Sequence, residues 1–365
     1  MCKRDTWSRQ QVQVHQAHAL HSLREFAYAH SPFYQRFHKG KTDRPLSELP
    51  ILTTDVLMEN FDQVMTDRSV RLGEVQAHVS RIRGDEHFRG QYWVSPTPGD
   101  TRQCGLILFD DAEWTTVLAS SARARQWAGM RAGVNHHMKL ASVLCTVACG
   151  MMGRIGVTLD SNRTPALHLD ASLPLNVMVQ HLNEWQPEVL IVCPSLGRAL
   201  AEEQISGRLR LSPQHIFTCG EALTAATRQQ LETAWGKRLF NQYAVTESGG
   251  LGAECDHHIG MHLFDDLVIT EVVDEHYRPV PPGVPGDKVL VTVLYKRAQP
   301  LIRYEISDRL RMMTTPCACG RPFRLIDNLQ GHNEESSSPT STDGIPLAMR
   351  PNIPHRLMQP LPVSG

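Results

Sequence analysis

Between Tyr92 and Leu310 the chain alternates short apolar runs with stretches of helical periodicity. The strand-like runs are LILFD (106–110), VLIVCP (189–194), HIFTCG (215–220), RLFNQYAV (238–245) and KVLVTVLY (288–295). The helix-like stretches are EWTTVLASSARARQWAG (113–129), LNVMVQHLNEW (175–185) and ATRQQLETAW (226–235). Strands that alternate with helices favour a parallel sheet covered by helices. The pattern therefore predicts an α/β fold with a largely parallel sheet.

The two ends of the chain differ from this central region. Apolar residues at helical spacing over roughly the first 40 residues predict a long helix that ends at Ser31. The pair Thr54-Asp55 is typical of the N-cap of a further, short helix. Residues 331–365 are polar and rich in serine and proline, which predicts a linker or tail. We therefore expect one large body, residues 1–330, followed by a short remainder.

The composition excludes several classes of protein. Lys and Arg (37) balance Asp and Glu (38), so no overall field directs the chain to nucleic acid or to a membrane. No stretch reaches the roughly 20 apolar residues of a membrane helix, and the polar N-terminus lacks the apolar core of a secretion signal. The nine cysteines are mostly scattered, unlike a disulfide framework. We expect a soluble, cytoplasmic protein.

Four segments carry the residue types of a ligand site. The first is the loop VSPTPGDTRQCG (94–105), whose hydroxyls and backbone N–H groups suit an anion, although such loops are more often simple turns. The second and third, TCGEALT (218–224) and NQYAVTESGG (241–250), lie at strand ends, where α/β proteins bind ligands. In the third, an aromatic ring can stack on a base, while the carboxylate and hydroxyl suit Mg²⁺ and a phosphate oxygen. The fourth, LIRYEISDR (301–309), places Asp308 where it can accept hydrogen bonds from ribose hydroxyls; a salt-bridged surface strand is the commoner use of such charges.

In this order along the chain, the four segments resemble the adenylate-forming superfamily, and specifically its phenylacetate–coenzyme A ligase-like branch. Further segments extend the resemblance over almost the whole chain: HSPFYQRF, LPILTTDVLMENFD, LNEWQPEVLIVCPSLGRALAEEQISGRL, GMHLFDDLVITEVVD, PPGVPGDKVLVTVLYKRAQPLIRYEISD and CACGRPF. The resemblance implies the large N-terminal domain of an adenylate-forming enzyme, with helix-covered sheets. It also implies a reaction in which a carboxylic acid and Mg-ATP form an acyl-adenylate, whose acyl group usually passes to coenzyme A.

The resemblance assigns roles to individual residues. Thr246 contacts the AMP phosphate and Glu247 holds Mg²⁺, and these two are the catalytic pair. Tyr243 stacks on adenine, and Asp308 binds the ribose hydroxyls. The rest of the ATP/AMP site comprises Thr97, Gly99, Thr101, Gly220, Glu221, Ala222 and Arg303. Because negative charge builds on the α-phosphate, a metal and aimed donors stabilise the reaction without an acid or base of tuned pKa.

Three departures from the family pattern bear on activity. The phosphate loop, roughly Ser-Ser-Gly-Thr-Thr-Gly in the family, is replaced by TPGDTR (97–102), where the proline removes an N–H donor and the aspartate adds negative charge. The hinge, usually Gly-Arg-x-Asp-Asp, reads GHNEE (331–335). No lysine follows Lys296, so we expect the small C-terminal lid domain and its adenylation lysine to be largely missing. Loss of such a cation typically costs orders of magnitude in rate.

A cysteine and histidine cluster predicts a separate metal site. CDHH (255–258) and CAC (317–319) lie about 60 residues apart and supply the sulfur and nitrogen ligands of a tetrahedral structural zinc site. We favour Cys255, His258, Cys317 and Cys319 as ligands, with His257 or His262 as substitutes for the histidine. Some members of the related branch carry the same pairing; reduced cysteines beside surface histidines are the alternative. Four protein ligands would leave no position for a reactive water.

The leading interpretation is ATP-dependent activation of a small carboxylic acid and transfer to coenzyme A. The acid would lie between the loops at Gly220 and Tyr243 and the helices around Trp127. The alternative is a catalytically impaired homologue that binds nucleotide, an acyl ligand or a partner protein. An intermediate case is a half-enzyme that uses a separate lid chain or forms a homodimer. The main interpretation requires the loops around residues 220, 246 and 308 to meet in one pocket.

Overall fold

The computed structural model describes residues 1–82, 84, 86–97, 104–130, 138–144, 150–161 and 164–327. Its largest sheet has eight strands in the order β13-β9-β8-β7-β6-β5-β3-β4. The strands that run parallel to one another are β3 (Leu140–Leu144), β4 (Ala166–Asp170), β5 (Val189–Val192), β6 (His215–Thr218) and β7 (Leu239–Val245). The antiparallel strands are β8 (Gly249–Glu254), β9 (Met261–Leu263) and β13 (Leu325–Ile326). The predicted α/β fold is confirmed, and the sheet is parallel on one side of β7 and antiparallel on the other.

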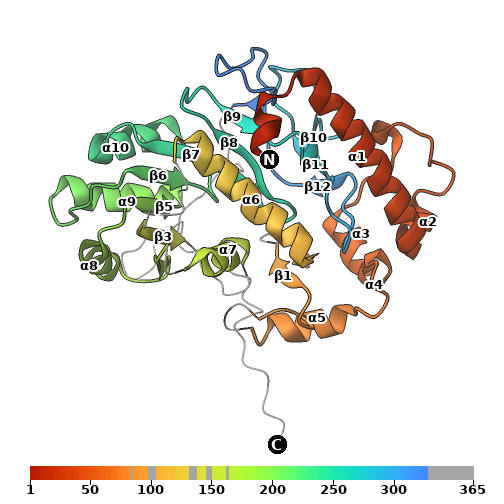
Figure 1. Cartoon of the computed structure of the whole chain (residues 1–365), viewed down its shortest axis with the longest axis horizontal. Helices are drawn as coiled ribbons and strands as arrows, with labels where there is room; N and C mark the ends of the chain where they lie inside the picture. Colours follow the sequence, from red (N-terminus) through yellow and green to blue (C-terminus); the bar gives the residue numbers. More distant parts are fainter. Residues whose placement is uncertain are drawn as a thin grey trace, which may run out of the picture.

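Helices cover both faces of the parallel half of this sheet. One face packs against α8 (Leu175–Trp185), α9 (Pro194–Ile205) and α10 (Ala225–Trp235), which lie together at the left of Figure 1. Ala141 and Val143 of β3 point into this apolar core. Because successive strand residues face opposite ways, Leu140 and Ser142 face the other side, toward α6 (Asp111–Trp127) and α7 (Met151–Leu159).

The N-terminal part of the chain forms a helical region beside two smaller sheets. Its helices are η1 (Cys2–Thr6), α1 (Arg9–His30), α2 (Pro32–Phe37), η2 (Leu46–Glu48), α3 (Thr54–Glu59), α4 (Phe61–Val64) and α5 (Leu72–Val79). The small sheets comprise β1 (Trp93–Pro96) with β2 (Leu106–Phe109), and β10 (Val268–Val273) with β11 (Lys288–Val293) and β12 (Tyr304–Ile306). Ser31 ends α1 and caps α2, whose first residue is proline, so the predicted helix end is confirmed. The second predicted N-cap is displaced by one residue toward the N-terminus, because Thr53 rather than Thr54 caps α3.

A buried cluster of charges ties the first residues of the chain to the middle of the fold. Asp266 accepts two hydrogen bonds from Arg123 of α6, at 2.6 and 2.9 Å, and forms an ion pair with Arg4 at 3.2 Å. The neighbouring Asp265 pairs with Arg9 and Arg324, both at 2.6 Å. Both carboxylates are fully buried, so these arginines supply the charge compensation that burial requires.

Within the part of the chain that the structure describes, no helix combines the length and the apolar character needed to cross a membrane. The predicted hinge and remainder, residues 331–365, lie outside the described residues.

Candidate active site

The candidate site lies at the carboxyl ends of two neighbouring parallel strands. β6 and β7 pair side by side, and the Thr218 hydroxyl donates to the Asn241 side-chain carbonyl at 3.0 Å across them. Gly220 follows β6 with φ of +83°, a conformation that favours glycine, and so turns the chain toward α10. The Thr224 hydroxyl then caps α10 by accepting from the backbone N–H of Thr227.

The structure joins the third and fourth predicted segments directly. The Tyr243 hydroxyl on β7 donates to an oxygen of Asp308 at 2.5 Å, although the two residues lie 65 positions apart. Tyr243 is almost fully buried, and burial together with the Asp308 charge raises the pKa of its hydroxyl well above the ordinary value. The hydroxyl therefore stays protonated and continues to donate to the carboxylate at neutral pH. The predicted convergence of these two segments is present.

Glu247 is a buried carboxylate at the same place. Burial, with a further contribution from the Asp308 charge, raises the pKa of Glu247 to about 7, while a hydrogen bond with Tyr304 opposes the shift. The Tyr304 hydroxyl lies 2.8 Å from the Thr54 hydroxyl, which fixes its ring against the N-terminal region. Two carboxylates close together in a buried setting repel each other, and a divalent cation with oxygen ligands relieves that repulsion. The local chemistry therefore fits the predicted Mg²⁺.

A second cluster brings three cysteines and a histidine together beside β9. Ligand atoms of Cys255, His262, Cys317 and Cys319 all lie within 4.8 Å of one another. The sulfur of Cys319 is 3.2 Å from Nε2 of His262, and the sulfurs of Cys255 and Cys317 are 3.7 Å apart. The other ring nitrogen of His262 lies 3.3 Å from the carbonyl of Phe323, the arrangement that commonly orients a metal-binding histidine.

The histidine preferred from the sequence, His258, is not part of this cluster. His258 contributes no atom to it, because its Nδ1 lies 3.3 Å from a carboxylate oxygen of Glu254. His262 takes its place, since antiparallel pairing sets it opposite Ala253 on β8 and opposite Leu325 on β13. The sequence spacing after Cys255 favoured the nearer histidine, whereas the sheet brings the farther one to the sulfurs.

Comparison with known proteins supports the resemblance to this family. Residues 128–291 match the family model described as AMP-binding enzyme. The phenylacetate–coenzyme A ligase of Thermus thermophilus is 25% identical over 96% of this chain and 78% of its own length. That of Escherichia coli is also 25% identical, over 91% of this chain and 73% of its own length. The chain therefore resembles the adenylate-forming superfamily, and within it the phenylacetate–coenzyme A ligase-like branch.

Solved structures of adenylate-forming enzymes share the fold. A 2-hydroxyisobutyryl-CoA ligase in the postadenylation state matches with a TM-score of 0.71 and 20% identity, over 90% of this chain and 69% of that one. An open conformation of the same ligase matches equally well, over 93% of this chain and 79% of that one. At this level of identity the match establishes the architecture alone.

Several of the predicted nucleotide contacts already have hydrogen-bond partners within the chain. The Thr97 hydroxyl accepts from the backbone N–H of Gly105 at 2.9 Å and so closes the base of the phosphate loop. Gly99 and Thr101 of that loop lie outside the described residues. The Glu221 carboxylate accepts from the backbone N–H and the hydroxyl of Ser195, both at 2.8 Å, in the first turn of α9. The roles of these side chains toward a nucleotide stay predictions.

Arg303 is held away from solvent by other parts of the adenylate-forming fold. Its guanidinium donates to the carbonyls of Leu49 at 2.6 Å and Ser47 at 2.9 Å, and to the Glu271 carboxylate at 3.1 Å. The side chain is almost fully buried. These contacts favour a structural role that joins the three-stranded sheet to the N-terminal region. Of the segment that contains it, Asp308 is the residue that reaches Tyr243.

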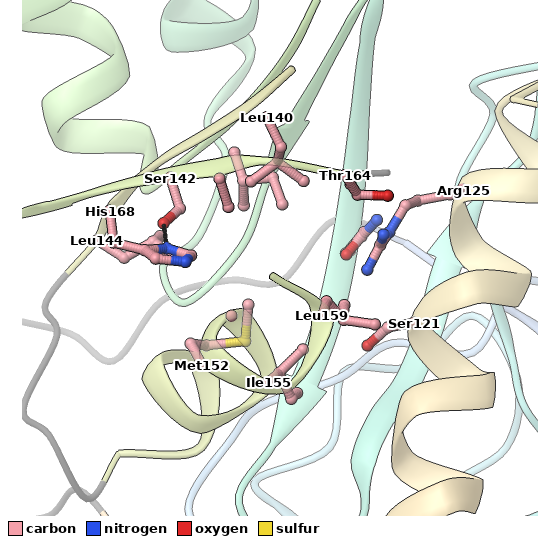
Figure 2. A pocket seen from close by; sticks show the side chains of 14 residues that line it. Ser121, Arg125, Leu140, Ser142, Leu144, Met152, Ile155, Leu159, Thr164 and His168 are labelled. Atoms are coloured by element: carbon pink, nitrogen blue, oxygen red, sulfur yellow. Dashed lines mark hydrogen bonds between the residues drawn. The ribbon is translucent and has the colours of Figure 1, made fainter. Parts of the chain in front are cut away.

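A pocket that the sequence did not reveal lies between the parallel strands and helices α6 and α7 (Figure 2). Its polar lining includes Arg125 of α6, Ser142 of β3, His168 of β4 and Gln242 of β7. Gln242 lies on β7, whose last residue directly precedes Thr246, so the pocket and the candidate active site share this strand. The available signal was the alternation in β4, where His168 and Asp170 alternate with leucines, and the single polar residue of β3, Ser142.

Proposed function

We propose that this chain activates a carboxylic acid with ATP as an acyl-adenylate and transfers the acyl group to coenzyme A. The observation that carries the proposal is the hydrogen bond from Tyr243 to Asp308 beside the buried carboxylate of Glu247. It brings together an aromatic ring and two carboxylates, one of which would accept from ribose while the other would hold a cation. The named activity of the relatives supports the same reaction, as does the neighbouring ligase solved with an acyl-AMP and coenzyme A.

The chain's own residues would bind and orient the reactants. Tyr243 fixes one oxygen of Asp308, and the other oxygen is left to accept from the ribose hydroxyls. The Thr246 hydroxyl would donate to the α-phosphate, and Glu247 would hold Mg²⁺. The bound cation would neutralise charge that develops on the phosphate. The backbone of Gly220 and Ala222 would line the adenine, and Thr97, Gly99 and Thr101 would lie along the polyphosphate.

Carboxylate-dependent pyrophosphate exchange tests this function. We expect exchange that requires an acid, ATP and Mg²⁺, and we expect the E247Q variant to reduce it by at least about 100-fold, because the metal ligand is lost. An exposed carboxylate far from the site, such as Glu25 on α1, provides the matched control in E25Q. The absence of exchange across a broad panel of acids, together with measurable AMP binding, would support the impaired homologue instead.

We further propose that Cys255, His262, Cys317 and Cys319 hold a structural zinc ion. Three thiolates and one imidazole form a donor set typical of tetrahedral zinc. The short distances among their ligand atoms and the oriented His262 ring support the proposal. Such a site would connect the β8–β9 hairpin to the segment before β13 and would stabilise the fold without taking part in catalysis.

A further inference from the structure

The pocket beside Gln242 has one apolar and one polar part. The apolar part is lined by Leu140, Leu144, Met152, Ile155, Leu159, Ala166 and Ile191. Figure 2 shows Arg125 extending from α6 across the pocket, toward the strands of the sheet. A guanidinium that enters a largely apolar pocket is costly unless an opposite charge compensates it.

Arg125 has no such compensation within the chain as described. Among the described residues, no carboxylate forms an ion pair with it, and no hydrogen bond from its guanidinium is found. Burial lowers the pKa of Arg125, and no acidic neighbour opposes the shift. Arg123 on the same helix is fully buried, and its charge is compensated because it is paired with Asp266. The pocket therefore has an unmatched positive charge.

A second polar group in the pocket also lacks a partner. Nδ1 of His168 lies 2.7 Å from the Ser142 hydroxyl, as the dashed line in Figure 2 shows. Its other nitrogen, Nε2, is buried without a hydrogen-bond partner among the described residues. A buried nitrogen without a hydrogen-bond partner is unfavourable, and a ligand atom that bonds to it would remove that cost. Arg125, His168 and Gln242 thus give the pocket several groups suited to a polar ligand atom.

The size of the pocket limits what can bind there. Its volume is about 30 Å³, and a water molecule requires at least about 10–15 Å³ on the same measure. The space therefore matches about two waters, which is close to the size of one carboxylate group. A carboxylate also matches the fork of a guanidinium, which can donate two parallel hydrogen bonds to it.

We propose that the acid activated by this chain is a dicarboxylic acid, and that Arg125 binds the carboxylate that does not react. This inference rests on the proposed function. The reacting carboxylate would lie at the end of β7 near Thr246, the far carboxylate would occupy the pocket beside Arg125, and the aliphatic chain would run between the two. Arg125 is then a specificity-determining residue for the acid, acting through an ion pair at the far end of the substrate.

The test compares diacids with monoacids of the same length. Succinate through suberate, and butanoate through octanoate, are used as substrates for pyrophosphate exchange with the wild-type chain, R125M, R125E and R198M. Arg198 is an exposed arginine on α9, on the opposite side of the sheet, and R198M is the matched control. We expect the wild type and R198M to prefer the best diacid by about 10- to 150-fold in kcat/KM, the range of a charge-assisted hydrogen bond. R125M should lose that preference, and R125E should favour an ω-amino acid of the same length.

Binding of the diacid alone, measured by calorimetry, is a readout that does not need turnover. Exchange with monoacids but no diacid preference in the wild type would overturn the inference and leave the proposed function standing. A diacid preference that survives in R125M would overturn the role of Arg125. If no acid supports exchange, the proposed function fails, and calorimetry then decides the diacid site alone: diacid binding that R125M abolishes supports the site, and absence of binding overturns it.

Discussion

The cysteine cluster gives a quantitative prediction that distinguishes the two histidines, because H262A should lose zinc and stability whereas H258A should not. If zinc joins Cys255 to Cys317, it closes a loop of 62 residues. Chain-entropy arguments give a cross-link of that span about 4 kcal/mol of stabilisation at 25 °C. We therefore expect a chelator, or the H262A variant, to lower the free energy of unfolding in urea by about that amount. The H258A variant should retain both the zinc and most of the stability.

Metal analysis of the purified variants accompanies the unfolding measurements. We expect about one zinc per chain in the wild type and in H258A, and none in H262A or in C319A. The measurements require a reducing agent, because the sulfurs of Cys255 and Cys317 are close enough to be oxidised together. A wild-type chain without zinc whose stability is unchanged by chelation would refute the site. Zinc that is lost in H258A and kept in H262A would refute the ligand assignment.

Three further predictions follow from buried groups elsewhere. The R123M variant leaves Asp266 buried with less compensation, so the free energy of unfolding should fall by about 3–5 kcal/mol; a loss below about 1 kcal/mol would contradict a tightly coupled pair. The Y243F variant removes the donor to Asp308, and we expect AMP to bind about tenfold more weakly by calorimetry; an unchanged affinity would separate Asp308 from the nucleotide site. Burial, with nearby positive charges, lowers the pKa of His38 to about 4, so the folded chain keeps it neutral while the unfolded chain protonates near 6.5. The free energy of unfolding should therefore fall by up to about 3 kcal/mol from pH 6.5 to 4. In urea unfolding, the H38N variant should lose less stability over that pH range, and an unchanged pH dependence would contradict the lowered pKa of His38.

Local patterns predicted much of the fold. The helix predicted at 175–185 coincides with α8, and the apolar runs at 189–194 and 215–220 contain β5 and β6. These elements bury one face against α9 and α10, so their periodicity is strong. The antiparallel half was not foreseen, because β8 is rich in glycine, β9 and β13 are short, and β13 pairs with β9 across a long sequence separation.

The limits of sequence reasoning are clearest on α6. Arg123 and Arg125 are two residues apart in the same ARAR motif, and nothing in the sequence distinguishes them. Two positions correspond to about 200° around a helix, so one arginine reaches Asp266 and the other enters the pocket. Their roles depend on which tertiary partner each face meets. By contrast, the family motifs correctly brought Tyr243 and Asp308 together, because the motif order reflects a shared arrangement of loops.

The ion pairs of Arg4 and Arg9 affect the order in which the molecule is completed. Their partners, Asp266 and Asp265, are synthesised more than 250 residues later. During translation the first helix therefore emerges long before its docking site exists. Contacts of such long sequence separation form late and slow folding. The segment that contains Arg4 and Arg9 is consequently among the last to dock. Until it docks, the nascent protein carries two aspartates that lack part of their compensating positive charge.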